Sequence, residues 1–222
     1  NKLRNKIDLI DNQILTLLKN RSKLAIKIGE VKKHSKTKND LYRPERQAEI
    51  LRRLFSKKSN LLKEVDILNL WRQIFTHQIS LQGKINYIIP KNLNKIEERT
   101  IINSFGNNIQ FNIVDNLKEG FDITKKKNNF IFILPFPNKS LRSKWWINKA
   151  CSNLYIVDSI PQLRDINSIP QLVLISKHSP NIKGSYTYVY KSLSCEKNKN
   201  MIKVVELNKN NLYISQKLYK ND

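Results

Sequence analysis

Residues 3–31 read LRNKIDLIDNQILTLLKNRSKLAIKIGEV. Apolar side chains recur in this stretch every three or four residues, which predicts one long amphipathic helix with a seam that packs on partner helices. The apolar stripe consists of Leu3, Ile7, Ile10, Ile14, Leu17, Leu24, Ile28 and Val31. Arg21 interrupts this stripe, and Lys32 closes it.

Arg21 stands where helix packing calls for an apolar residue. A guanidinium in a helical core is costly unless an anion is its partner. No acidic residue of the same helix face lies within a turn of Arg21. We therefore expect Arg21 to bind an anion. The alternatives are that it extends to solvent or meets a carboxylate of another helix.

The spacing of the basic residues indicates how such an anion is held. Arg21 and Lys32 are eleven residues apart, so they project in nearly the same direction about 16 Å apart along the helix and can bracket a small dianion. Arg4 lies about 25 Å from Arg21 on a different azimuth. If Arg4 contributes to the same site, it does so from a second, antiparallel subunit, which predicts a homodimer.

Two further helices are predicted after a polar loop. The segment YRPERQ, residues 42–47, begins the second helix, with Pro44 at its first position. Ser59 or Asn60 is expected to cap the third helix. Gln78 and Gln82 lie one turn apart near the end of that helix, and Gln82 places an amide on the apolar stripe.

Together these residues resemble the all-helical chorismate mutase domain. The motifs that carry the resemblance are LRNKIDLID at residues 3–11, the Arg21 position, IGEVK at 28–32 and YRPER at 42–46. The resemblance covers about residues 1–85. It implies an intertwined three-helix dimer that converts chorismate to prephenate, with no cofactor and no covalent intermediate.

The resemblance also implies roles for individual residues. Arg21 and Arg46 of one subunit and Arg4 of the other would hold the two carboxylates of chorismate. Lys32 and Gln82 would donate hydrogen bonds to the ether oxygen, where negative charge develops as the C–O bond breaks. Bidentate arginine suits a carboxylate, whereas a compact ammonium suits a point of developing charge.

The sequence departs from the family at two substrate-binding positions. Gln47 stands where the family usually has a glutamate that accepts from the substrate hydroxyl, so this position keeps an acceptor and lacks the charge. Gln78 stands where a small hydroxyl residue is common. Both remain in the predicted site.

The loop between the first two helices is about two residues longer than is usual in the family. The alignment of the residues on either side of this loop with the family's site residues therefore stays open. Lys33 can take the place of Lys32, or Arg43 the place of Arg46. Arg43 is therefore included among the candidate substrate-binding residues.

Residues 86–222 have a different periodicity and are predicted to form an α/β domain with a mixed sheet, so the whole chain is an α+β multidomain protein. The predicted strands are 85–89, 109–114, 130–134, 154–157, 172–176, 186–190, 202–206 and 213–215, and the predicted helices are 94–105, 117–125 and 140–150.

This order of strands and helices is loosely similar to one lobe of a prephenate dehydratase domain. The Thr-Arg-Phe catalytic motif of that family is absent, so we expect no dehydratase activity. The sequence assigns no function to residues 86–222. A regulatory site for an aromatic amino acid and a packing or dimer-supporting role both remain open.

Composition limits the other classes of function. The net charge of +23 divides into +12 for residues 1–85 and +11 for the rest, with no basic tail, so we expect no nucleic-acid partner. No apolar run is long enough to span a membrane. Cys151 and Cys195 show no metal-ligand spacing, which predicts free thiols in the cytoplasm and no metal.

Two alternatives to the mutase stay open. Related helical domains eliminate pyruvate from isochorismate at a similar cationic site, although Arg46 and Gln82 favour the mutase. A non-catalytic sensor or partner of another enzyme, derived from a mutase domain, is the second alternative, and it is motivated by Gln47.

Overall fold

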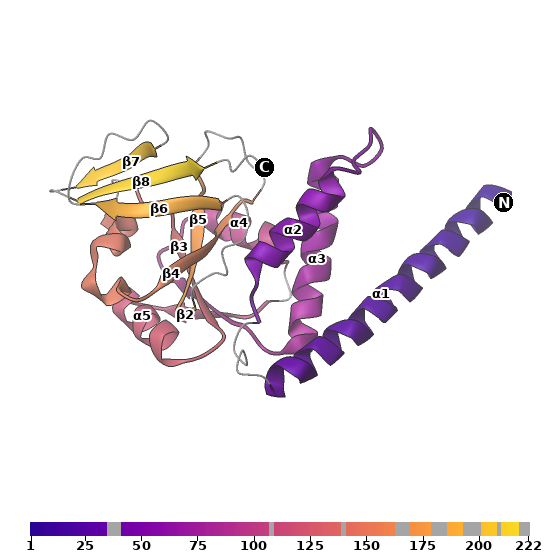
Figure 1. Cartoon of the computed structure of the whole chain (residues 1–222), viewed down its shortest axis with the longest axis horizontal. Helices are drawn as coiled ribbons and strands as arrows, with labels where there is room; N and C mark the ends of the chain where they lie inside the picture. Colours follow the sequence, from indigo (N-terminus) through magenta and orange to yellow (C-terminus); the bar gives the residue numbers. More distant parts are fainter. Residues whose placement is uncertain are drawn as a thin grey trace.

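The computed structural model describes residues 1–34, 41–106, 109–138, 141–162 and 169–178, together with the strands 186–192, 201–207 and 210–217 (Figure 1). The side chains of residues 33, 34, 141–143 and 179–222 are not described. Predictions that concern the Lys33 side chain and Cys195 therefore lie outside the described part.

The N-terminal part is helical, as predicted. α1 (Lys2–His34) is one uninterrupted helix, α2 (Pro44–Phe55) has Pro44 as its first residue, and α3 (Glu64–Gln82) follows. α2 packs on α3 through a small apolar cluster centred on Leu51, Leu68 and Phe75. The N-terminal half of α1 extends away from the rest of the chain (Figure 1).

The predicted start of the third helix is wrong. Ser59 does not cap a helix but closes a turn, in which the backbone N–H of Leu62 donates to the Ser59 carbonyl and to its Oγ. α3 begins at Glu64, because Asp66 accepts from the backbone N–H of Lys63 at 3.0 Å and so caps the helix there. Leu61, in the turn before α3, is 96% exposed.

Small residues set the contact between α1 and α3. Ala25 and Gly29 are the buried positions of α1. A Cβ at Gly29 would lie 2.9 Å from the Cα of Gln82, so the two backbones touch at this point. The apolar stripe of α1, by contrast, is exposed in the single chain. The side of α1 that faces α3 carries the small residues Ala25 and Gly29, each of which directly follows a residue of the stripe.

The second region is built on a five-stranded mixed sheet, which confirms the predicted fold class. Its strand order is β2-β1-β3-β5-β4. β1 is parallel to β2 and β3, whereas β5 is antiparallel to β3 and β4. The elements are β1 (Asn86–Pro90), α4 (Lys95–Phe105), β2 (Phe111–Val114), α5 (Leu117–Lys126), β3 (Phe130–Pro135), β4 (Tyr155–Ile160) and β5 (Leu172–Ser176). α3 ends at Gln82 and β1 begins at Asn86, so the predicted division at residue 85 falls in the connection between them.

The sheet has a core on each face. One core gathers Phe121, Phe132 and the two tryptophans Trp145 and Trp146, and the other gathers Tyr87, Ile101, Phe105 and Ile133. The central strands β3 and β5 are buried nearly throughout because both of their faces are covered. Asn94 and Asn116 cap the two covering helices by accepting from Glu97 and Glu119 backbone N–H groups.

The helix predicted for residues 140–150 is instead a pair of 3₁₀ turns, η1 (Leu141–Ile147) and η2 (Lys149–Cys151). The Trp145 indole N–H donates to the Pro135 carbonyl at 2.7 Å, which ties the first turn to β3. Asn148 accepts from the Ala150 backbone N–H and starts the second turn. These side-chain bonds compete with a continuous helix.

The last three predicted strands form a sheet of their own. β6 (Tyr186–Ser192), β7 (Met201–Leu207) and β8 (Asn210–Lys217) are antiparallel in the order β6-β8-β7. In the part of the chain that the structure describes, no helix is long and apolar enough to cross a membrane.

Gly120→Ala is expected to destabilise the α/β region. A Cβ at Gly120 in α5 would overlap the ring of Phe132, which is fully buried in β3. Overpacking of this kind typically costs about 1–3 kcal/mol. Urea unfolding followed by tryptophan fluorescence measures the loss. Lys118→Ala, at an exposed position of the same helix, should change the stability by less than about 0.5 kcal/mol; equal effects of the two variants would contradict the packing described.

Candidate active site

Two predicted site residues, Lys32 and Gln82, meet where the C-terminal ends of α1 and α3 lie side by side. The Lys32 ammonium Nζ donates to Gln82 Oε1 at 3.3 Å. Both side chains are half-buried. This pairing depends on Gly29, one turn before Lys32, because its missing side chain lets the Gln82 backbone approach.

Gln78 lies one turn earlier on α3 and is turned inward. It is 4% exposed, and its Nε2 donates to Ser22 Oγ of α1 at 2.8 Å. Its Oε1 is buried and has no hydrogen-bond partner among the described residues. Gln82 Nε2 donates to the Gln78 carbonyl at 3.4 Å, so the two glutamines are linked. A buried acceptor without a partner marks a place where a donor is missing.

Arg21 lies on the same side of α1, over the ring of Phe75 in α3, with its guanidinium carbon 5.8 Å from the ring centre. Burial lowers the pKa of this guanidinium, because desolvation disfavours its charge. Among the described residues Arg21 has no carboxylate partner. The alternative that a carboxylate of another helix neutralises it therefore does not apply within the described chain.

Four predicted residues thus line one contact between α1 and α3: Arg21, Lys32, Gln78 and Gln82. We call this contact the α1–α3 seam. Sequence reasoning missed Ser22 and Phe75, which hold Gln78 and Arg21 in place. Ser22 directly follows Arg21, so the helix periodicity predicts its position beside the seam. Its hydrogen bond with Gln78 depends on how α1 and α3 cross and cannot be predicted from one helix.

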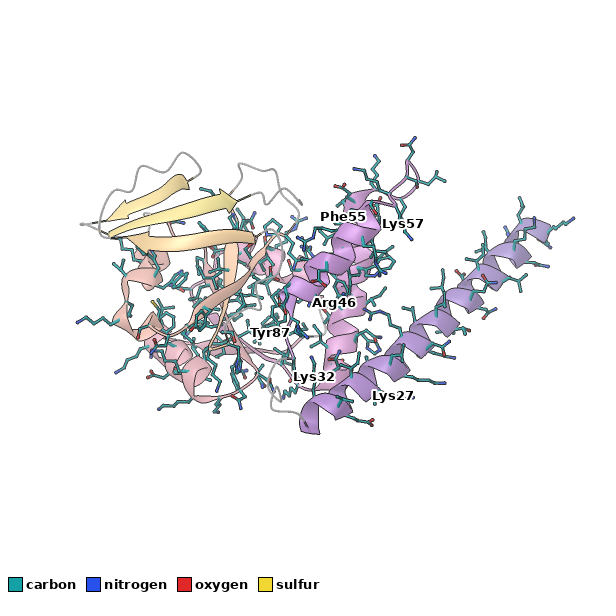
Figure 2. All side chains as sticks on the ribbon, in the orientation of Figure 1. Lys27, Lys32, Arg46, Phe55, Lys57 and Tyr87 are labelled. Carbon is teal, nitrogen blue, oxygen red and sulfur yellow. The ribbon has the colours of Figure 1, made fainter. Side chains whose placement is uncertain are left out.

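The structure does not gather the α2 residues at this seam. Arg46 donates to Glu49 of its own helix at 2.9 Å and is 64% exposed. Arg43 pairs with Glu45 at 3.1 Å. Gln47 lines a small cavity between α2, α3 and the sheet. Figure 2 shows Arg46 on α2 and Lys32 at the C-terminal end of α1.

Arg4 lies far from the seam along α1. It is exposed in the first turns of the helix, in the part that extends away from the chain (Figure 1). Within one chain it therefore does not join Arg21. In the described ranges, no group of three or more His, Cys, Asp or Glu side chains is placed to hold a metal ion.

Comparison with known proteins shows that the helical part of the chain matches a family model. The family model described as chorismate mutase type II matches residues 3–83. The N-terminal part of the chain is a chorismate mutase type II domain. This match spans α1, α2 and α3, including every predicted site residue of the mutase domain.

Two curated relatives are similar to part of the chain. A bifunctional chorismate mutase/prephenate dehydratase of Aquifex aeolicus is 40% identical over 100 residues, which are 40% of this chain and 26% of the relative. A protein of the same name from Neisseria gonorrhoeae is 32% identical over 90 residues, 40% of this chain and 24% of the relative. The matched part is thus about a quarter of the length of these relatives. No solved structure matches the chain significantly.

Gly29→Ala is expected to push α1 away from α3. Alanine is the better helix former by about 0.8–1.0 kcal/mol, yet its Cβ would press on the Gln82 backbone, which cannot move without moving α3. We expect a lower melting temperature. Circular dichroism measures it, with Lys27→Ala on the exposed side of the same helix as the control. A higher melting temperature for Gly29→Ala would show that the close approach contributes nothing.

Proposed function

We propose that the mutase domain rearranges chorismate to prephenate at the α1–α3 seam. The observation that carries the proposal is Arg21, a half-buried cation without a carboxylate partner among the described residues, placed on the same seam as the Lys32–Gln82 pair. A buried cation of this kind is stable when an anion binds it, and chorismate carries two carboxylates. The family match and the relatives support this reading.

The chemistry needs no acid–base pair. In the rearrangement the C–O bond of the enolpyruvyl ether breaks while a C–C bond forms, and negative charge develops on the ether oxygen. Lys32 meets this charge with its ammonium. Gln82 orients Lys32 by accepting from its ammonium through Oε1. Gln82 Nε2 is held weakly at 3.4 Å by the Gln78 carbonyl, so it is available as the second donor.

The carboxylates of the substrate require the remaining cations. Arg21 binds one of them from the seam. Arg46 supplies a further contact by leaving Glu49, at a small cost because exposed ion pairs contribute about 0–1 kcal/mol. Gln78 and Gln47 provide amides to the substrate, and Arg43 serves if the register is shifted. The positive charge of the chain attracts a dianion toward the site.

Arg4 completes the site from a second copy of the chain, so the active form is a homodimer. The apolar stripe of α1 is exposed along its length, with Leu3 76% exposed. Exposed apolar surface of this extent indicates an interface. An open hollow of about 560 Å³ between α1 and α3, lined by Leu15, Leu18 and Ile74 among others, continues this surface. We further propose that the enzyme works in the cytoplasm, where the Cys151 thiol stays reduced.

Isochorismate pyruvate elimination is the competing reaction at such a site. Incubation of the purified chain with isochorismate tests it: salicylate and pyruvate would show a lyase. If neither chorismate nor isochorismate is consumed, the non-catalytic sensor is the better account.

Lys32→Ala is expected to lower kcat for chorismate by about 10²–10³-fold, because a donor to a developing oxyanion contributes about 2.7–4 kcal/mol. Steady-state kinetics on chorismate consumption measures it, with Lys27→Ala as the control for loss of one exposed charge. A change confined to KM would mean that Lys32 binds the ground state and does not stabilise the transition state.

The dimer is tested by mixing two inactive variants. Arg4→Ala and Arg21→Ala, unfolded and refolded together, give heterodimers in which one site lacks both arginines and the other is intact. Random pairing then restores roughly a quarter of the wild-type activity. Each variant refolded alone is the control. If heterodimers are present by native mass spectrometry and activity stays at the level of the single variants, each site is built from one chain.

A further inference from the structure

A partly buried hydrogen bond joins the mutase domain to the sheet. The hydroxyl of Tyr42, two residues before α2, donates to Asp158 Oδ2 of β4 at 2.6 Å. The two residues are 116 positions apart in the sequence. A hydroxyl that donates to a carboxylate at this distance makes a strong, charge-assisted bond.

Asp158 is held by several groups besides Tyr42. Gln162 Nε2 donates to the same oxygen at 2.8 Å, and the Ser159 backbone N–H donates to the other oxygen at 2.7 Å. Burial raises the pKa of Asp158, while these hydrogen bonds and the charge of Arg72 oppose the rise. Burial also raises the pKa of Tyr42, so its hydroxyl keeps its proton and remains a donor.

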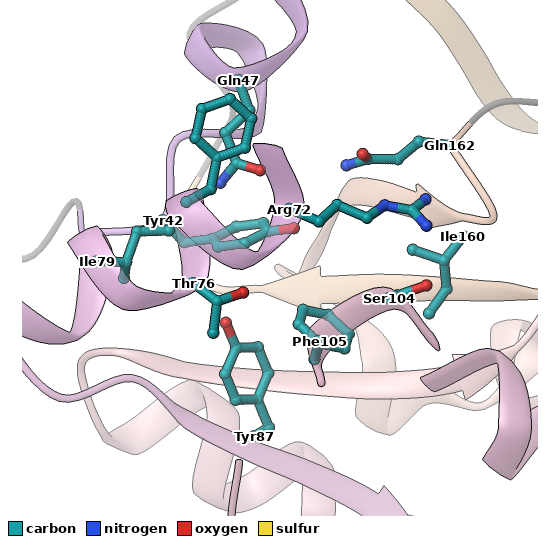
Figure 3. A pocket seen from close by; sticks show the side chains of 11 residues that line it. Tyr42, Gln47, Arg72, Thr76, Ile79, Tyr87, Ser104, Phe105, Ile160 and Gln162 are labelled. Atoms are coloured by element: carbon teal, nitrogen blue, oxygen red, sulfur yellow. The ribbon is translucent and has the colours of Figure 1, made fainter. Parts of the chain in front are cut away.

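A small cavity with a mixed polar and apolar lining lies beside this bond. A cavity of about 20 Å³, enough for one water molecule, is lined by Gln47, Arg72, Thr76, Tyr87, Ser104 and Gln162, among others. Figure 3 shows the Arg72 side chain running toward Gln162. Arg72 Nη2 is buried without a hydrogen-bond partner among the described residues. The cavity is too small for an organic ligand, so we assign a structural role to Tyr42, Asp158, Gln162 and Arg72. We call these four residues the joint, because they connect the helical part to the sheet.

The joint lies at the start of the helix that carries the α2 site residues. Arg43 follows Tyr42 directly, and Pro44 then fixes the backbone as the first residue of α2. Gln47 also lines the cavity beside the joint, and its side chain is half-buried. Leu41, just before Tyr42, is buried and lies against Gly83, the residue that directly follows α3. The start of α2 is therefore fixed on one side by α3 and on the other by Asp158.

We propose that Asp158, acting through Tyr42, is a positioning residue for substrate binding: the α/β region sets the position of α2 and so of Arg46 and Gln47. This inference rests on the proposed mutase function. It gives residues 86–222 a role in the reaction although the described part of them contributes no side chain to the α1–α3 seam.

Tyr42→Phe in the full chain tests the link, because it removes the hydroxyl and keeps the ring that packs against the sheet core. The matched control is Tyr155→Phe, the same change at an exposed tyrosine of β4, the strand that carries Asp158. We expect Tyr42→Phe to raise KM for chorismate about tenfold and to leave kcat within about twofold, since Lys32 and Gln82 lie on α1 and α3. Hydrogen exchange of the amides of residues 44–55 should become faster, while exchange in α1 stays unchanged.

The two readouts separate the possible failures. If KM or the α2 exchange rates of Tyr42→Phe match those of Tyr155→Phe, the proposed positioning is wrong. If the wild-type chain does not consume chorismate, the proposed function fails, and faster α2 exchange by itself then decides whether Asp158 holds the helix. Asp158→Asn serves as the second variant where Tyr42→Phe does not fold, with Asp115→Asn, an exposed aspartate of the same region, as its control.

Discussion

The backbone contact between Gly29 and Gln82 is the constraint on which the candidate site depends. Because Gly29 has no side chain, α1 and α3 approach closely enough for Lys32 to reach Gln82 at 3.3 Å. Further along the same crossing, Ser22 holds Gln78 and Phe75 lies under Arg21. A larger residue at position 29 would open the crossing along its whole length. The chemistry proposed for the domain is thus a consequence of helix packing that places two amides and two cations in one seam.

Much of this was predictable from the sequence, because helix periodicity fixes direction. The spacing of Arg21 and Lys32 placed both on one side of α1, and the spacing of Gln78 and Gln82 placed both amides on one side of α3. In the sheet, β-branched runs bounded by polar residues identified each strand to within a few residues. The start of α3 was missed because Asp66 is a better capping acceptor for this stretch than Ser59, which is occupied in its own turn.

What the sequence did not reveal depends on contacts between distant segments. Tyr42 and Asp158 look unremarkable in their local patterns, and their bond exists because the sheet brings β4 beside the start of α2. The helix expected at 140–150 became 3₁₀ turns because Trp145 bonds to the Pro135 carbonyl. The α2 arginines meet carboxylates of their own helix in the single chain. In the proposed site these arginines turn to the substrate only when it binds, and Arg4 of α1 comes from a second copy of the chain. Neither the ligand nor the second copy can be inferred from a local sequence pattern.

In the proposed function, Arg21 without a carboxylate partner among the described residues and the Lys32–Gln82 pair form a site for chorismate. Proton NMR of chorismate incubated with the full chain tests it most directly, since it follows substrate and product in one sample. We expect the chorismate signals to be replaced by those of prephenate, with no release of pyruvate. In a sample of Arg21→Ala that is folded by circular dichroism, chorismate should disappear only at its spontaneous rate. Equal rates of prephenate formation in the wild-type and Arg21→Ala samples would contradict the account.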